Sequence, residues 1–421
     1  MEGFSIFVGV DWGSEAHQVC VLDVARKVLL EKSFPHSGKG LSSLVAALLK
    51  LADDKAERVA VAIEKPNGAI VETLLERGIS VFAINPKQLD RFRDRHTVAG
   101  AKDDRRDALV LADSLRTDRQ AFRQARLGDP LLVQLRELSR MQEGLRAERV
   151  SLGNQLREQL HRYFPQILEL GSVYDAHWLW ELLKVAPTPE LARRLSLAKL
   201  GSLLKKHRIR NVSAEQAREI LRAEPLRVAP GVTEASRKHV AMILPRLRLV
   251  DEQKAEVERD IATLLEQLSA PVEGKTEHRD ALLLQSLPGL GKLVCATMLA
   301  EASEPLERRD YTTLRSLCGV APVTKRSGKQ LAVSRRTSSN SRLQLAVHFW
   351  ANSAVQCDSH WKSRYASARA SGHSHARALR GIGDRLLAVL IAMLKTNSPY
   401  DPQCRRAPRG LGPTLAQPAA S

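Results

Sequence analysis

The chain has 421 residues, and its 65 lysines and arginines against 47 aspartates and glutamates give a formal net charge of +18. The excess lies at one end, because residues 311–421 contain 17 basic and 3 acidic side chains. Clustered basic side chains neutralise phosphates and release counterions, so this charge predicts a nucleic-acid partner. A hydrophobic content of 43% can build buried cores, which excludes a chain that is disordered throughout.

Two further classes of protein are excluded by the sequence. No apolar run approaches the roughly 20 residues that span a membrane, and the first residues lack the layout of a signal peptide. We therefore expect a cytoplasmic protein with no membrane partner. The five cysteines are scattered and form no C-x-x-C pair, so neither a disulfide framework nor a structural zinc site is expected.

Residues 1–125 predict an α/β domain. Short apolar runs alternate with amphipathic segments, and the inferred order is βββαβαβ. The first three strands follow one another directly, which indicates a meander. The expected strands are 6–11, 18–23, 28–34, 59–64 and 79–85, and the expected helices are 41–51, 69–77 and 104–116.

Residues 126–275 predict a coiled coil. Apolar residues recur at threes, fours and sevens over 131–164 and again over 239–268, which is the pattern of long amphipathic helices. Two such helices can pair antiparallel, and Pro245 is expected to start or kink the second one. The segment between them, about 171–232, is expected to be a helical insertion to which the sequence assigns no role.

Residues 276–402 predict a mostly helical C-terminal domain. A helix at 282–287, a glycine turn and a helix at 292–302 resemble a helix-hairpin-helix unit, whose turn amides can face a phosphate. An ordinary packing turn is an equal alternative. A basic stretch rich in glycine and serine follows at 319–340, then helices at 343–354, 361–370 and 377–394, and an expected disordered tail at 403–421.

Four carboxylates form a candidate metal site. Asp11 and Glu64 each end an apolar strand, and Asp104 and Asp107 are three residues apart on one helix face. If the two strands are neighbours, their acids lie side by side and repel each other unless a cation sits between them. Carboxylates are the ligands that Mg²⁺ prefers, and two ions about 4 Å apart can orient a phosphodiester for in-line attack.

Each acid also has an ordinary explanation. An acid at a strand end is usually a solvated terminus, and acids among arginines usually belong to a solvated helix face. The four acids in this order, with this strand pattern, match the ribonuclease-H-like nuclease plan.

At these positions the sequence resembles the DEDD-type transposases and site-specific invertases of insertion-sequence family 110, related to Piv-type invertases. The resemblance covers about residues 4–165 and 240–402. The matching text is VGVDWG at 8–13, IEKPNG at 63–68, NPKQ at 85–88, the segment 100–113, LPGLG at 287–291, LCGVAP at 317–322 and KRSGK at 325–329.

This resemblance implies a RuvC-like nuclease domain, long coiled-coil helices and a C-terminal transposase domain with an essential serine, which is Ser327 by motif position. It implies Mg²⁺, or Mn²⁺, at Asp11, Glu64, Asp104 and Asp107. The implied partners are target and donor DNA and a guide (bridge) RNA encoded by the element, bound by dimers that assemble into tetramers. The implied reaction passes through a covalent phosphoserine, and the implied setting is the bacterial nucleoid.

Two features depart from the family pattern. The insertion at 171–232 has no counterpart in compact members, so nothing carries over to it. Asp103 stands where a small hydroxyl residue is common, which leaves open whether Asp103 or Asp104 binds metal, although the three-residue step to Asp107 favours Asp104.

The surroundings of Ser327 are basic. Serine is a weak nucleophile that needs a base, a metal or a cationic setting, and a basic loop can stabilise the charge that develops on a phosphate. By composition alone this serine is more simply a phosphate-contact or turn residue, and only the resemblance favours a nucleophile. The expected nucleic-acid-binding residues are Arg105, Arg106, Lys325, Arg326, Lys329, Arg335 and Arg336.

Two alternatives to a transposase remain at this point. A metal-dependent Holliday-junction nuclease would use the same acids without a covalent intermediate. A non-catalytic DNA- or RNA-binding protein would have acids with a structural role only. An aromatic content of only 4% argues against recognition by base stacking, and favours backbone contacts with sequence read by base pairing.

Overall fold

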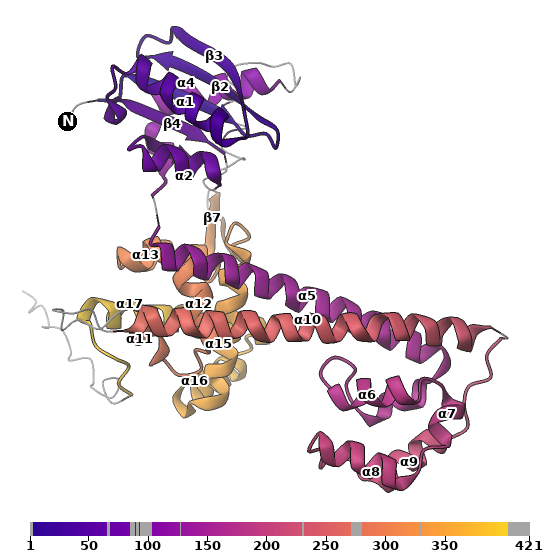
Figure 1. Ribbon diagram of the computed structural model, residues 1–421. Coiled ribbons are helices and arrows are strands. Elements are labelled where there is room, and N and C mark those ends of the chain that lie inside the picture. The colour runs from indigo at the N-terminus through magenta and orange to yellow at the C-terminus, as the bar shows by residue number, and fades with distance from the viewer. Residues whose placement is uncertain are drawn as a thin grey trace, which may run out of the picture. The chain divides into compact units, whose positions relative to one another are not determined.

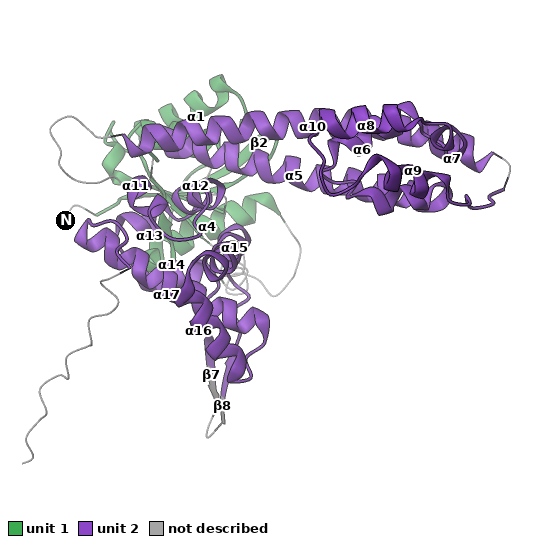
Figure 2. Ribbon diagram, turned by 90° about the horizontal axis from the view of Figure 1, so that it is seen from below, with its two compact units in different colours: residues 1–129 green, residues 130–421 purple. Residues whose placement is uncertain are grey.

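The computed structural model describes residues 3–64, 68–84, 89, 92, 103–126, 128–229, 231–270, 280–327 and 330–402. The chain divides into two compact units, residues 1–129 and residues 130–421, which Figure 2 distinguishes by colour. The first unit is mixed α/β and the second is almost entirely helical. The expected fold class is confirmed at this level.

The first unit contains a six-stranded sheet. In chain order its strands are β1 (Ile6–Asp11), β2 (Ala16–Asp23), β3 (Val28–Pro35), β4 (Val59–Ile63), β5 (Ser80–Ala83) and β6 (Arg123–Gln124). Their order across the sheet is β3-β2-β1-β4-β5-β6. The first three strands form the expected antiparallel meander, and β4 and β5 continue in parallel with β1. The short β6, which the sequence pattern did not predict, pairs antiparallel with β5.

Helices cover both faces of this sheet. Those described are α1 (Gly38–Leu51), α2 (Ala69–Glu76) and α4 (Asp104–Thr117). Side chains alternate between the two faces along a strand, so each strand contributes to two cores. Val8 and Val10 pack with residues of α1 and α2, whereas Phe7 packs with residues of α4.

Two long antiparallel helices organise the second unit, as predicted. They are α5 (Pro130–Tyr163) and α10 (Val232–Ser269), which lie side by side in Figure 1. Leu135, near the start of α5, shares a core with Leu264, near the end of α10, and Leu156 shares a second core with Ile243. This pairing of early with late residues defines the antiparallel direction. Pro245 lies inside α10.

The insertion between these helices is helical, as expected. Its elements are η3 (Pro165–Leu170), α6 (His177–Val185), α7 (Pro189–Arg193), α8 (Leu197–Lys206) and α9 (Ala214–Arg222). Their apolar side chains form one core with the adjoining ends of α5 and α10. Trp180 is buried in this core, and its indole Nε1 donates a hydrogen bond to the carbonyl oxygen of Val173 (2.8 Å).

In the described ranges 280–327 and 330–402, the rest of the second unit consists of helices and a β-hairpin. The helices are α11 (Asp280–Gln285), α12 (Lys292–Glu301), α13 (Ser303–Glu307), α14 (Tyr311–Leu317), α15 (Ser341–Cys357), α16 (Ser359–Ala370) and α17 (His375–Thr396). The hairpin consists of β7 (Val323–Ser327) and β8 (Gln330–Ser334). None of the helices in the described ranges is long and apolar enough to cross a membrane.

The glycine turn between α11 and α12 packs against α15. Gly289 has a φ of +72°, and a Cβ built there would lie 2.5 Å from the backbone nitrogen of Ala354. The indole Nε1 of Trp350 donates a hydrogen bond to the carbonyl oxygen of Pro288 (3.1 Å). Of the two roles considered for this turn, these contacts favour packing.

Candidate active site

Asp11 and Glu64 are neighbours at one edge of the sheet. β1 and β4 pair in parallel, and their register sets Val10 opposite Ile63. The next residue along each chain is Asp11 and Glu64, respectively. The two chains therefore reach the same edge of the sheet with an acid each, and the condition that these strands are neighbours is fulfilled.

Both acids belong to the face of the sheet that α4 covers. Phe7 on β1 and Ala60 and Ala62 on β4 lie in the core beneath α4. Because side chains alternate along a strand, Asp11 shares the face of Phe7. Glu64 follows β4 by one residue and continues the alternation of Ala60 and Ala62. Both acids are half-buried there.

α4 approaches the sheet closely at Gly9. A Cβ built on Gly9 would lie 1.9 Å from the carbonyl oxygen of Ala108 and 2.6 Å from the backbone nitrogen of Ala112. Both contacts are with backbone atoms of α4, which cannot rotate away as a flexible side chain could. Glycine at this position is therefore what lets the helix lie against the strand that carries Asp11.

α4 runs antiparallel to β1. Near its C-terminal end, Asp113 forms an ion pair with Arg26 (Oδ2 to Nε, 3.2 Å), and Arg116 donates a hydrogen bond to the carbonyl oxygen of Val24 (3.3 Å). Val24 and Arg26 belong to the turn after β2, and the last residue of β2 pairs with the first of β1. The N-terminal turn of α4 is therefore directed toward the opposite end of β1, where Asp11 lies.

That turn carries the other two predicted ligands, Asp104 and Asp107. They lie on one helix face, with Asp107 buried (5% exposed) and Asp104 exposed. Asp103 is the N-cap of α4, and its carboxylate accepts a hydrogen bond from the backbone N–H of Arg105 (3.1 Å). A carboxylate engaged in capping favours Asp104 over Asp103 as the acid available to a ligand.

The four acids have the right chemistry for a magnesium site but do not form a closed one. Among the described residues, no group of three or more His, Cys, Asp or Glu side chains is close enough to hold a metal ion. Mg²⁺ usually binds through one or two carboxylates together with waters and substrate phosphates. The pair Asp11 and Glu64 supplies the two adjacent carboxylates that a site of this kind would use.

A buried histidine that the sequence pattern does not single out lies close to this edge. His17 on β2 is fully buried, its Nε2 lies 2.9 Å from Nδ1 of His36, and its own Nδ1 has no hydrogen-bond partner among the described residues. Burial lowers the pKa of His17 below its ordinary value, and the nearby His36 lowers it further. The ring of Trp12 lies 6.4 Å from that of His17. The only sequence signal was a histidine at an inward position of an alternating strand.

Ser327 lies at the end of β7, not in a loop. In the β7–β8 hairpin Ser327 pairs with Gln330, at the far end from Val323 and Ser334. In the sequence two residues, Gly328 and Lys329, separate the strands, and a glycine in a two-residue connection is the sequence signal that could have predicted this hairpin. Lys325 and Arg326 lie on β7. Lys329 is outside the described residues.

The predicted phosphate-contact arginines lie in both units. Arg105 and Arg106 are exposed on the first turn of α4, and Arg105 lies 3.6 Å (Nε to Oε1) from Glu31. Arg335 and Arg336 follow β8. Arg335 is exposed, whereas Nε of Arg336 is buried without a hydrogen-bond partner in the described part of the chain.

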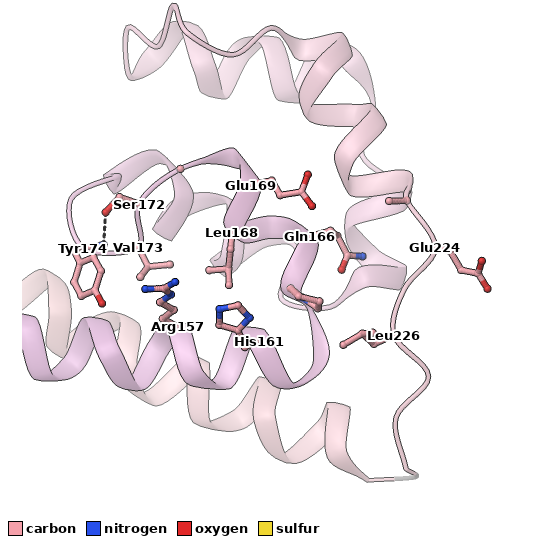
Figure 3. A pocket seen from close by; sticks show the side chains of 13 residues that line it. Arg157, His161, Gln166, Leu168, Glu169, Ser172, Val173, Tyr174, Glu224 and Leu226 are labelled. Atoms are coloured by element: carbon pink, nitrogen blue, oxygen red, sulfur yellow. Dashed lines mark hydrogen bonds between the residues drawn. The ribbon is translucent and has the colours of Figure 1, made fainter.

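A cavity of about 770 Å³ lies in the insertion, where none of the predicted site residues lines it (Figure 3). Arg157 and His161, one turn apart on α5, project toward Leu168 and Val173. Gln166 also lines the cavity, and its buried side-chain nitrogen has no hydrogen-bond partner in the described residues. The cavity is thus separate in the chain from the acids and from Ser327.

Comparison with known proteins identifies two family models in this chain. Residues 8–165 match a model described as transposase, of the IS110 DEDD type. Residues 281–366 match the model of the transposase IS116/IS110/IS902 family. The two matches contain the four acids and Ser327, respectively.

Curated relatives extend over the whole chain. The protein named as the transposase of the IS117 mini-circle of Streptomyces coelicolor is 33% identical over 415 residues, covering 97% of this chain and 98% of that protein. A protein of Sinorhizobium fredii, also named as a transposase, is 50% identical over 209 residues, covering 49% of this chain and 58% of that protein. The uncharacterized 43.6 kDa protein of insertion element IS110 of Streptomyces coelicolor is 28% identical over 97% of this chain.

Proposed function

Because the chain belongs to the IS116/IS110/IS902 family of transposases, we propose that it cuts and exchanges DNA strands through a DEDD metal site and a covalent phosphoserine. Family membership by itself implies cleavage and rejoining of DNA in general. The finer assignment rests on one observation above all, the register that brings Asp11 and Glu64 to one edge of the sheet on the face of α4.

The metal site in this proposal consists of Asp11, Glu64, Asp104 and Asp107, in a domain of RuvC-like plan. Bound Mg²⁺, or Mn²⁺, would supply a Lewis acid that neutralises charge on the phosphodiester. The carboxylates of these residues would bring negative charge together at the proposed metal site. The adjacent strand ends set the distance between Asp11 and Glu64, and Gly9 lets α4 lie close enough to direct its first turn toward them.

Ser327 is the proposed nucleophile. Its Oγ attacks phosphorus, an Oγ–P bond forms, the bond from phosphorus to one deoxyribose oxygen breaks, and the serine proton is lost while the leaving oxygen gains one. A hydroxyl of another strand then attacks the phosphoserine and restores the serine. The basic side chains that flank Ser327 in the sequence support this role, because they can stabilise the charge on the phosphate.

The proposed partners are target and donor DNA, an element-encoded guide RNA and further copies of this chain. The acids and Ser327 lie in different compact units. A composite site, with acids from one protomer and Ser327 from another, would unite them in a dimer or tetramer. The low aromatic content and high positive charge support backbone contacts, with sequence read by pairing to RNA.

The test is a search for a protein–DNA adduct. Protein, Mg²⁺, RNA transcribed from the flank of the element and end-labelled DNA are incubated, denatured and separated by electrophoresis. The wild-type protein is expected to retain label through a covalent bond, whereas Ser327→Ala is expected to retain none. Ser334→Ala, on the other strand of the same hairpin, is the matched control and is expected to behave as wild type.

The acids are tested in the same assay. Asp11→Asn and Glu64→Gln are expected to reduce adduct formation by at least 10²-fold, and the exposed Glu72→Gln of α2 serves as control. Cleavage without an adduct, unchanged by Ser327→Ala, would instead identify a nuclease without a covalent intermediate. Binding without cleavage in the complete mixture would identify a nucleic-acid-binding protein.

A further inference from the structure

Four arginines from two segments of the second unit lie at the base of the β7–β8 hairpin and the start of α17. Arg335 and Arg336 follow β8 directly, and Arg377 and Arg380 are three residues apart on one face of α17. Val320, three residues before the start of β7, has its Cγ1 3.7 Å from the Cβ position of Gly383 on α17, so the base of the hairpin packs beside the helix that carries Arg377 and Arg380. Burial lowers the pKa of Arg380, and the charges of Arg335 and Arg377 lower it further. The like charges of Arg335, Arg377 and Arg380 therefore repel one another in the folded protein.

No acid in the described part of the chain forms an ion pair with any of the four. The acid of α17, Asp384, is already engaged by Arg315 and by the hydroxyl of Tyr311 (2.8 Å). Nε of Arg336 is buried and lacks a hydrogen-bond partner among the described residues. A buried polar group without a partner, beside repelling charges, lowers stability unless an external group compensates.

From this arrangement we propose that Arg335, Arg336, Arg377 and Arg380 form a binding site for a phosphodiester group of a nucleic-acid backbone. A planar guanidinium donates two parallel hydrogen bonds to phosphate oxygens, which a lysine cannot do. The N-terminus of α17, a 22-residue helix that begins two residues before Arg377, adds partial positive charge. The choice of a nucleic acid as the source of the phosphate rests on the proposed function.

The hairpin relates this site to Ser327. Val323 pairs with Ser334 at the base and Ser327 with Gln330 at the far end, so four residues separate Ser327 from the base along β7. At about 3.3 Å per residue the separation is about 13 Å. A nucleic-acid duplex rises about 3.4 Å per nucleotide on each strand, so the bound phosphate would be about four nucleotides from the one that Ser327 attacks.

The test measures binding and stability together, without cleavage. The double variant Arg377→Gln and Arg380→Gln is titrated with a fluorescein-labelled 30-base-pair DNA duplex and, separately, with a labelled RNA hairpin, over 50–200 mM KCl. Loss of one duplex phosphate contact is expected to flatten the slope of log K against log salt by about 0.9. The thermal midpoint is expected to stay equal or to rise, because the substitutions relieve repulsion.

Charge-matched and rescue variants complete this experiment. Arg193→Gln with Arg194→Gln removes the same charge from an exposed part of the insertion, and its slope is expected to equal that of wild type. Arg377→Lys with Arg380→Lys keeps the charge, and is expected to restore the slope without restoring full affinity. If the slope of log K against log salt becomes flatter only with the DNA duplex, or only with the RNA hairpin, that result identifies which nucleic acid the site binds.

Unchanged slopes with both nucleic acids, or weaker binding accompanied by a lower thermal midpoint, would overturn the proposal. Neither of these results depends on DNA cleavage, because the same titrations are also made with Ser327→Ala protein, which lacks the proposed nucleophile. Conversely, an absence of phosphoserine would leave the binding site intact, so the two proposals fail independently.

Discussion

The backbone of Ala108 occupies the space in which residue 9 would carry a side chain, since a Cβ on Gly9 would lie only 1.9 Å from the carbonyl oxygen of Ala108. This contact joins β1, which ends at Asp11, to α4, which begins with Asp104. A single glycine thus determines how closely the two groups of acids can approach.

Gly9→Ala is expected to displace α4 and to lower the free energy of unfolding by about 3 kcal/mol, at the upper end of overpacking effects. Urea unfolding of the full chain measures this change. Gly144→Ala is the control, because Gly144 is exposed on α5 with nothing within 4 Å of its Cβ position. It is expected to raise stability by up to about 1 kcal/mol. Equal stability of Gly9→Ala and wild type would show that α4 does not depend on this contact.

Substitutions of Asp103 and of Asp104 are expected to have opposite effects on adduct formation. Asp103→Ser keeps an N-cap for α4, so stability should change by less than about 1 kcal/mol and adduct formation should persist. Asp104→Asn is expected to abolish adduct formation without lowering the thermal midpoint. The measurements are the adduct assay and thermal unfolding of both variants. Loss of activity in Asp103→Ser with normal activity in Asp104→Asn would reverse the assignment.

His17 is expected to make stability depend on pH. Its folded-state pKa is lowered, so the folded protein binds fewer protons than the unfolded chain. The stability it contributes is present above the unfolded pKa of about 6.5 and is lost as the pH falls below that value. Urea midpoints between pH 7.5 and 5.0 should therefore fall more steeply for wild type than for His17→Gln. The exposed His161→Gln should keep the wild-type steepness, and an equally steep His17→Gln would contradict this account.

The turn before α12 is expected to tolerate change at one glycine and not at the other. Gly289→Ala combines a left-handed φ with a Cβ 2.5 Å from the nitrogen of Ala354, and should cost about 2 kcal/mol or more. Gly291→Ser places a good N-cap residue where nothing lies within 4 Å, and should change stability little. If the turn serves packing, Gly291→Ser also keeps wild-type affinity for the DNA duplex. A weakened affinity would indicate a phosphate contact instead.

Much of the fold follows from local patterns. The 3.6-residue periodicity of α5 and α10 and the alternating apolar strands of the first unit are properties of short segments, so their positions could be predicted within a few residues. The β7–β8 hairpin was missed because β7 is mostly basic and polar and β8 has only a short apolar run, Leu331 to Val333, so neither strand shows a clear alternation. The short β6 was missed because it carries no apolar pattern of its own and exists only by pairing with β5.

The sequence by itself determined which residues are the candidates for the chemistry: the acids Asp11, Glu64, Asp104 and Asp107, the motif around Ser327, and the basic end of the chain. Only the tertiary structure decided how these residues are arranged in space relative to one another within each unit. The register that makes Asp11 and Glu64 neighbours, the direction of α4 and the grouping of Arg335 with Arg380 join segments far apart in the chain. Backbone pairing and close packing set these relations, and such contacts leave no periodic trace in the sequence.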